Sequence, residues 1–163
     1  MSDSSQQWVV PSAKDRLRIL QDSRTIAIVG ASNNSARASY FVGTYLLTIP
    51  SYTVWFVNPR ETEILGHTVF PSLSDLPAAP DIVDVFRKPS DLPEVLDQAV
   101  DASAKTLWLQ LGIEDPKIAQ LGHDSGMNVV MNRCLKIEHA RFHGGLHLAG
   151  FNTGVIRSTR RIT

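Results

Sequence analysis

The chain has 163 residues, 43% of them hydrophobic and 20% charged, which fits one globular domain (residues 1–163) with its own core. Its 16 basic and 16 acidic side chains cancel, which argues against non-specific binding to nucleic acid or to an anionic membrane. The apolar runs are too short to span a bilayer, the first residues lack a secretory signal pattern, and Cys134 is the only cysteine, so we expect a cytoplasmic protein without an intramolecular disulfide.

The two ends of the chain differ from its middle. Residues 1–11 are polar, and we expect them to be partly ordered. Ser12 and Asp15 have the spacing of a capping box, which predicts a short helix through Leu20. Residues 150–163 form a basic end, for which a solvated tail is the simplest interpretation.

Between these ends, apolar runs alternate with segments of helical pattern. This alternation predicts a Rossmann-like, doubly wound α/β fold with five mainly parallel strands and helices on both faces. Ligands of such sheets bind outside the carboxyl ends of the strands. The expected strands are Thr25–Val29, Thr53–Val57, Ile82–Phe86, Thr106–Leu109 and Asn128–Met131, and the helices between them are Tyr40–Thr48, Pro93–Ala102 and Pro116–Ser125.

The first expected strand continues into a small-residue loop and then a helix, which is the order found in phosphate-binding sites. The loop begins Gly30-Ala31-Ser32 and reaches Arg37 and Ser39. Serine hydroxyls, an arginine and the N–H groups of a helix start all suit a phosphate. Serines replace two glycines of the dinucleotide-binding pattern, and the Lys-Ser or Lys-Thr pair of a P-loop is absent, which argues against a nucleotide kinase. An ordinary strand-to-helix turn is the alternative.

The second expected strand ends differently from that of a typical NAD-binding protein. Such proteins carry an acid here that binds the ribose hydroxyls, whereas this chain reads Asn58-Pro59-Arg60. Arg60 favours a ribose with an additional phosphate, as in coenzyme A (CoA) or NADP, and Asn58 and Pro59 would shape the adenosine wall. A plain turn with a solvated arginine is the alternative.

Two further strand ends bring aromatic and polar groups to the same edge. Phe86 and Arg87 end the third expected strand, and Gln110 and Gly112 follow the fourth. We expect these residues to form a binding rim. A core position is the alternative for Phe86, and we expect a core position for Trp108.

Cys134 follows the fifth expected strand, close to Asn132 at the same edge. Arg133, Lys136 and a helix start would favour the reactive thiolate, which would allow a mixed disulfide with the pantetheine thiol. A small, buried and unreactive cysteine is the alternative.

No residue pattern predicts a catalytic or metal site. Asp84 lies inside an expected buried strand, where we expect it to be hydrogen-bonded for structural reasons. His139, His143 and His147 are spaced by four residues, but glycines interrupt the helical pattern and the H-E-x-x-H motif is absent. The nucleophile motif of serine hydrolases is also missing.

A set of motifs in a fixed order resembles the stand-alone CoA-binding protein family, which is related to the nucleotide-binding domain of the succinyl-CoA ligase α-subunit. The resemblance covers about Arg24 to Phe142. The motifs are VGAS at Gly30, R-x-S-Y at Arg37 to Tyr40, VNP at Val57 to Pro59, VFR at Val85 to Arg87, WLQLG at Trp108 to Gly112, and NRCLKIEH at Asn132 to His139.

This resemblance implies a CoA-binding Rossmann domain whose Gly30–Ser39 loop holds phosphate. The phosphohistidine domain of the ligase would lie beyond this length, so none of the five histidines inherits that role. Two positions depart from the family pattern. Ala38 replaces a usual proline, and Asn132 replaces a usual aspartate, which weakens any acid–base mechanism near Cys134.

Three hypotheses follow. The leading one is a non-catalytic binder of CoA or an acyl-CoA, acting as a carrier, a sensor or a subunit, either as a homo-oligomer or with a protein partner. The second is an NADP-dependent oxidoreductase that uses the same loop and Arg60. The third is an interaction protein with a vestigial nucleotide pocket.

Overall fold

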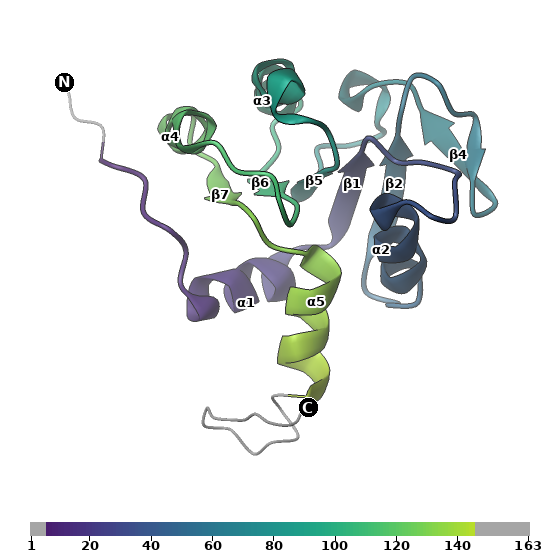
Figure 1. The fold of residues 1–163 in the computed structure, drawn as a ribbon, viewed down its shortest axis with the longest axis horizontal. Coiled ribbons are helices and arrows are strands. Elements are labelled where there is room, and N and C mark those ends of the chain that lie inside the picture. Colours follow the sequence, from purple (N-terminus) through teal and green to yellow (C-terminus); the bar gives the residue numbers. More distant parts are fainter. Residues whose placement is uncertain (1–5, 146–163) are drawn as a thin grey trace.

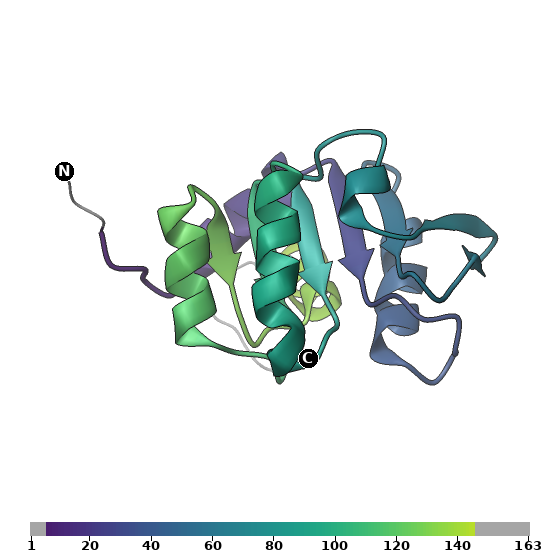
Figure 2. The same ribbon diagram turned by 90° about the horizontal axis from the view of Figure 1, so that it is seen from above.

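A seven-stranded, mainly parallel sheet forms the centre of the computed structural model, which describes residues 6–145 (Figures 1 and 2). The strand order is β3-β4-β2-β1-β5-β6-β7, and all neighbours run parallel except β3 and β4. The α/β class and the parallel arrangement are therefore confirmed. The strands are β1 (Thr25–Val29), β2 (Thr53–Val57), β3 (Glu63–Ile64), β4 (His67–Phe70), β5 (Ile82–Val85), β6 (Thr106–Leu109) and β7 (Asn128–Val130).

The predicted count of five strands is wrong, because β3 and β4 join the sheet beside β2. These two strands are short and form a hairpin around Leu65 and Gly66, both with positive φ (50° and 79°). Their sequence has no extended apolar run, and Leu-Gly is not one of the common hairpin turn pairs, so local pattern gave no signal. The five expected strands all exist, although β5 and β7 end one residue early.

Helices cover both faces of the sheet, as expected (Figure 1). One face carries α1 (Ala13–Asp22), α2 (Ala38–Leu47) and α5 (Leu135–Ala140), and a π-helical turn (Arg141–Gly145) continues α5. The opposite face carries α3 (Leu92–Asp101) and α4 (Pro116–Asp124). Short 3-10 turns span Leu73–Asp75 and Pro89–Asp91. The predicted capping box of Ser12 and Asp15 is confirmed at the start of α1.

Each face of the sheet contributes to a separate hydrophobic core. Ala27 and Val29 of β1 pack toward α3 and α4, whereas Ile26 and Ile28 pack toward α1, α2 and α5. Because both faces are covered, successive residues of the central strands β1, β5 and β6 are almost all buried, and their sequences, such as TLWL and IAIV, are nearly continuous runs of apolar residues.

The order in which the chain adds strands to the sheet changes direction at β1. The chain adds β2 and the hairpin on one side of β1 and then returns to place β5, β6 and β7 on the other. The carboxyl ends of β1 and β5 therefore form the switch point at which doubly wound sheets bind ligands.

The N-terminal segment contacts the edge of the sheet through Gln6 and Trp8. The Trp8 indole N–H donates to the Val129 carbonyl (3.1 Å), and the Gln120 side chain bonds the backbone of Trp8 (2.8 Å) and Gln6 (3.1 Å). The expected basic tail, residues 150–163, lies outside the described residues. Within residues 6–145, no helix combines the length and apolar character needed to span a membrane.

Candidate functional site

A pocket of about 630 Å³ opens at the carboxyl ends of β1, β2, β5 and β6, with α2 and α5 contributing to its walls. The topology thus brings together residues from five distant parts of the sequence. Nine residues that the sequence singled out line this pocket: Gly30, Ser32, Arg37, Ser39, Asn58, Phe86, Arg87, Gln110 and Cys134.

The other predicted site residues do not line the pocket but shape or extend its rim. The Asn58 amide donates to the Ala31 carbonyl (2.7 Å), which ties the end of β2 to the first loop. The Gly112 N–H donates to Asn132 Oδ1 (2.7 Å), and both residues have positive φ. The residues outside the pocket are the buried Ala31 and the exposed Pro59, Arg60, Gly112 and Asn132.

The loop after β1 has a defined shape that requires glycine at its start. Gly30 has φ of 83°, and a Cβ there would lie 2.5 Å from the Phe86 carbonyl oxygen. Side chains then fix the following turn. Ser39 Oγ accepts the Ser32 N–H (3.1 Å), and Ser32 Oγ accepts the Asn34 N–H (3.0 Å). The loop is therefore organised by its own hydrogen bonds.

The N-terminus of α2 faces this pocket without a side-chain cap. Arg37 is the N-cap residue, and its side chain accepts no helix N–H. The free N–H groups of a first helical turn and the helix dipole attract anions. The Arg37 guanidinium is exposed and forms no ion pair with the described residues, so its full charge is available beside the helix start.

Glu61 does not line the pocket but contacts its first loop, and the sequence analysis missed it. Its carboxylate Oε2 accepts the Asn33 N–H of the loop at 2.8 Å. No acid stands at the tip of β2, but Glu61 follows the end of this strand by four residues. The only local signal was an acid shortly after the strand, and its contact with the loop depends on the turn that follows Asn58.

The other end of the pocket is formed around Gln110 and Cys134. Gln110 is only 4% exposed, and its Oε1 accepts the Leu135 N–H (3.0 Å). Its Nε2 has no hydrogen-bond partner among the described residues. Cys134 is half-buried. The pocket-lining residues that were not predicted as binding residues are Ala38, Leu111, Ile113 and Ile137, of which Ile137 follows Cys134 at helical spacing.

The cations expected to act on Cys134 and on a ligand are directed elsewhere. Arg133 forms an ion pair with Glu138 (3.7 Å), and the Lys136 ammonium lies 5.8 Å from the centre of the Tyr45 ring. Arg87, which lines the pocket, pairs with Asp91 (2.9 Å). Arg37 is therefore the pocket-lining cation without an acidic partner in the described part of the chain.

Comparison with known proteins identifies the family of the chain. Residues 24–140 match the model of the CoA binding domain. The chain belongs to this CoA-binding domain family. YneT of Bacillus subtilis, an uncharacterized protein, is 34% identical over 130 residues, which are 80% of this chain and 96% of YneT. A solved hypothetical protein from Pyrococcus horikoshii OT3 is 33% identical with a TM-score of 0.79, covering 87% of this chain and 99% of that one.

A more distant relative is a ligase subunit. The α-subunit of an ADP-forming acetate–CoA ligase from Pyrococcus furiosus is 23% identical over 124 residues, or 70% of this chain. The match covers 27% of the ligase subunit, so it involves only one part of that protein. The resemblance drawn from the sequence motifs is confirmed, and family membership supports binding of CoA.

Beneath the pocket of this CoA-binding domain lies a buried acid without a partner. Asp84 in β5 is 0% exposed, and neither carboxylate oxygen has a hydrogen bond in the described structure. The prediction that Asp84 is hydrogen-bonded is therefore wrong. Burial raises the pKa of Asp84 well above its usual value, because the charged form loses its hydration. Its neighbour in β6, Trp108, is fully buried as expected and donates to the Arg133 carbonyl (2.8 Å).

The histidines contribute to packing next to α2. The His139 and His143 rings stack with centroids 4.1 Å apart, and His139 Nδ1 lies 2.8 Å from the Tyr45 hydroxyl. Burial, and secondarily His143, lower the pKa of His139 to about 4. Residues 6–145 contain no group of three or more ligands that could hold a metal. His147 lies outside the described residues.

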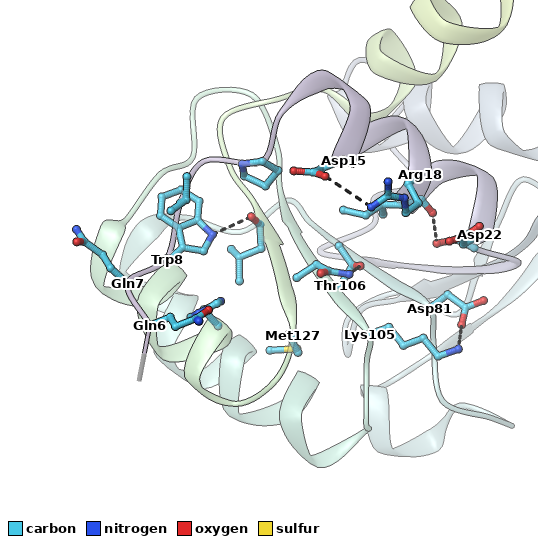
Figure 3. A pocket seen from close by; sticks show the side chains of 17 residues that line it. Gln6, Gln7, Trp8, Asp15, Arg18, Asp22, Asp81, Lys105, Thr106 and Met127 are labelled. Atoms are coloured by element: carbon cyan, nitrogen blue, oxygen red, sulfur yellow. Dashed lines mark hydrogen bonds and ion pairs between the residues drawn. The ribbon is translucent and has the colours of Figure 1, made fainter. Parts of the chain in front are cut away.

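A second pocket of about 560 Å³ lies at the opposite end of the sheet, between the N-terminal segment, α1 and the amino ends of several strands (Figure 3). Its charged side chains face one another. Arg18 lies 3.8 Å from Asp15, and Lys105 lies 3.5 Å from Asp81. This pocket therefore lacks the unpaired cation and the free helix N-terminus that distinguish the pocket at the carboxyl ends.

Proposed function

We propose that this domain binds CoA or an acyl-CoA at the carboxyl ends of the strands and acts as a non-catalytic carrier, sensor or subunit. The observation that carries the proposal is the uncapped N-terminus of α2 beside the unpaired Arg37, at the switch point of the sheet. In this proposal, the diphosphate of CoA lies against the first turn of α2, where helix N–H groups and Arg37 stabilise its charge.

The two remaining parts of CoA extend along the rim in opposite directions. The adenosine end lies toward Asn58, where the exposed Arg60 would reach the 3′-phosphate. The pantetheine arm lies toward Gln110 and Cys134, where Ile113 and Ile137 supply apolar contact.

The composition of the pocket supports a binding role rather than a catalytic one. In the described structure, no carboxylate and no imidazole lines it. General acid–base chemistry requires a proton-transferring group within hydrogen-bond reach of the substrate. The polar groups that are present, from serine, asparagine, glutamine and arginine, are suited to holding a phosphate and an amide chain.

Titration calorimetry with CoA, dephospho-CoA, NADP and NAD tests this proposal on the reduced protein. We expect CoA to bind more tightly than dephospho-CoA, and Arg60→Ala to remove that preference. Arg37→Ala should weaken the binding of both CoA and dephospho-CoA. The expected loss of affinity is roughly tenfold to a hundredfold if one charge-assisted hydrogen bond of about 1.5–3 kcal/mol is lost. Arg18→Ala is the matched control, because Arg18 lies at the second pocket.

Each other outcome favours a different function. Tighter binding of NADP than of CoA would contradict the proposal and favour the NADP-dependent oxidoreductase. Binding of none of the four ligands would favour an interaction protein whose nucleotide pocket is vestigial.

A further inference from the structure

Cys134 is held at a fixed place in the pocket by bonds to both of its neighbours in sequence. The Arg133 carbonyl accepts the Trp108 indole N–H (2.8 Å), and the Leu135 N–H donates to Gln110 Oε1 (3.0 Å). Trp108 and Gln110 both belong to the end of β6, so the backbone around Cys134 is anchored to the sheet. The half-buried thiol stands at the pocket wall and is not enclosed in the core.

Gln110 gives an independent indication of what occupies this end of the pocket. Its side chain is almost fully buried, and one half of its amide is used by Leu135. The other half, Nε2, is a hydrogen-bond donor at the pocket wall without a partner among residues 6–145. Because Nε2 is not one of the buried atoms without a partner, it is accessible from the pocket and can donate to a ligand with a carbonyl acceptor. The pantetheine arm of CoA carries two amide carbonyls and ends in a thiol.

The distances along the sheet allow that thiol to reach Cys134. The end of β6 lies two strand spacings from the end of β1, roughly 10 Å at about 4.8 Å for each spacing. The pantetheine arm is comparable in length to three or four extended residues, or about 12 Å. A diphosphate at the start of α2 would therefore place the end of the arm near Gln110 and Cys134.

We infer that Cys134 exchanges with disulfides of CoA and retains CoA as a mixed disulfide. This inference rests on the proposed CoA binding. The Cys134 thiolate attacks the CoA sulfur of a disulfide between CoA and a second thiol. The bond between Cys134 Sγ and the CoA sulfur forms, the original disulfide bond breaks, and the second thiol leaves as a thiolate that takes up the proton lost by Cys134. Cys134 is oxidised, the leaving thiol is reduced, and no further oxidant is needed.

The consequence is a redox-dependent lifetime of the complex. Reduced CoA dissociates at the rate set by its non-covalent contacts, whereas CoA bound through sulfur leaves only when another thiol attacks the mixed disulfide. The protein would thus withdraw CoA from an oxidised pool and return it when reducing thiols are restored.

The test uses the full-length reduced protein with CoA disulfide and, in parallel, with cystamine, a disulfide without a nucleotide. Intact-mass measurement over time should show one added CoA moiety, which dithiothreitol removes. We expect CoA disulfide to react at least tenfold faster than cystamine. Arg37→Ala should reduce this advantage while leaving the cystamine rate unchanged. Cys134→Ser should form no adduct with either disulfide.

The outcomes separate this inference from the proposed function. If reduced CoA binds in calorimetry but CoA disulfide reacts no faster than cystamine, Cys134 is merely accessible and the inference is overturned while CoA binding stands. If reduced CoA does not bind, both fail. Gln110→Leu gives a second readout in the ratio of the two rates. Loss of the bond to Leu135 affects the reactions with both disulfides, whereas loss of the Nε2 donor slows only the reaction with CoA disulfide, so the ratio should fall.

Discussion

The unpartnered acid of β5 should make the stability of the fold depend on pH. Asp84 lies between Ile28 of β1 and Trp108 of β6, and both of its oxygens lack partners among the described residues. Its pKa in the folded protein is raised by burial, whereas in the unfolded chain it returns to its usual value near 3.8. Between these two pKa values the folded protein carries one more proton than the unfolded chain, so the free energy of unfolding falls as pH rises.

The size of the effect follows from the proton count. One proton of difference changes the free energy of unfolding by about 1.4 kcal/mol for each pH unit. Asp84→Asn keeps the shape and the burial but cannot ionise. Between pH 5 and pH 7, we therefore expect the stability of this variant relative to the unmodified protein to increase with pH, by up to about 1.4 kcal/mol for each pH unit. This gain is a large part of a typical total stability of about 5–15 kcal/mol.

Urea unfolding of both proteins at pH 5, 6 and 7 measures this difference. The unmodified protein and Asp84→Asn share every other titrating group. Subtracting one curve of unfolding free energy against pH from the other therefore gives the contribution of Asp84 alone. Curves that stay parallel over this range would show that Asp84 binds the same number of protons in the folded and unfolded states between pH 5 and pH 7, and would refute the reasoning from its burial.

Three further predictions concern the loop, a buried histidine and a glycine. Glu61→Gln should tighten CoA binding in calorimetry, because the Glu61 carboxylate accepts a loop N–H and repels phosphate. Glu63→Gln, at the exposed position of β3, should change CoA binding less. Burial lowers the pKa of His139 in the folded protein, so the neutral side chain contributes to stability at pH values above about 6.5. This contribution to the free energy of unfolding is lost as pH falls from about 6.5 toward 4. His139→Gln should make the free energy of unfolding fall less steeply over this pH range, and an unchanged slope would contradict the prediction. Gly30→Ala should lower Tm by about 5 °C or more, since it adds a close contact to the strain of positive φ. Gly66→Ala introduces the same backbone strain of positive φ but no close contact. Equal decreases in Tm for the two variants would therefore exclude a role for the contact with Phe86.

Much of the fold was predictable because its signals are local. The apolar runs of β1 and β6, bounded by polar or glycine residues, fix the strands, and the Ser12 capping box marks the start of α1. Parallel order follows from the helices between strands, and the strand ends then indicate which residues share one rim. The pocket could be outlined on this basis without knowledge of any long-range contact.

The features that could not be predicted all depend on contacts between distant segments. Glu61 reaches the first loop only because the chain turns after Asn58. The missing partner of Asp84 can be seen only when every neighbour in the sheet is placed. Arg133 and Lys136 flank Cys134 in sequence, yet each contacts another residue in the fold. Sequence proximity therefore overestimated their effect on the thiol.

The attachment of the N-terminal segment has a consequence for the behaviour of the protein in solution. A strand at the edge of a sheet offers unpaired carbonyls and amides to any other strand and so invites aggregation. At the β7 edge, Trp8 takes the Val129 carbonyl and covers part of the core, while the opposite edge ends in β3, which is only two residues long. Both edges are thus poor templates for another chain, and a version shortened past Trp8 would expose one of them.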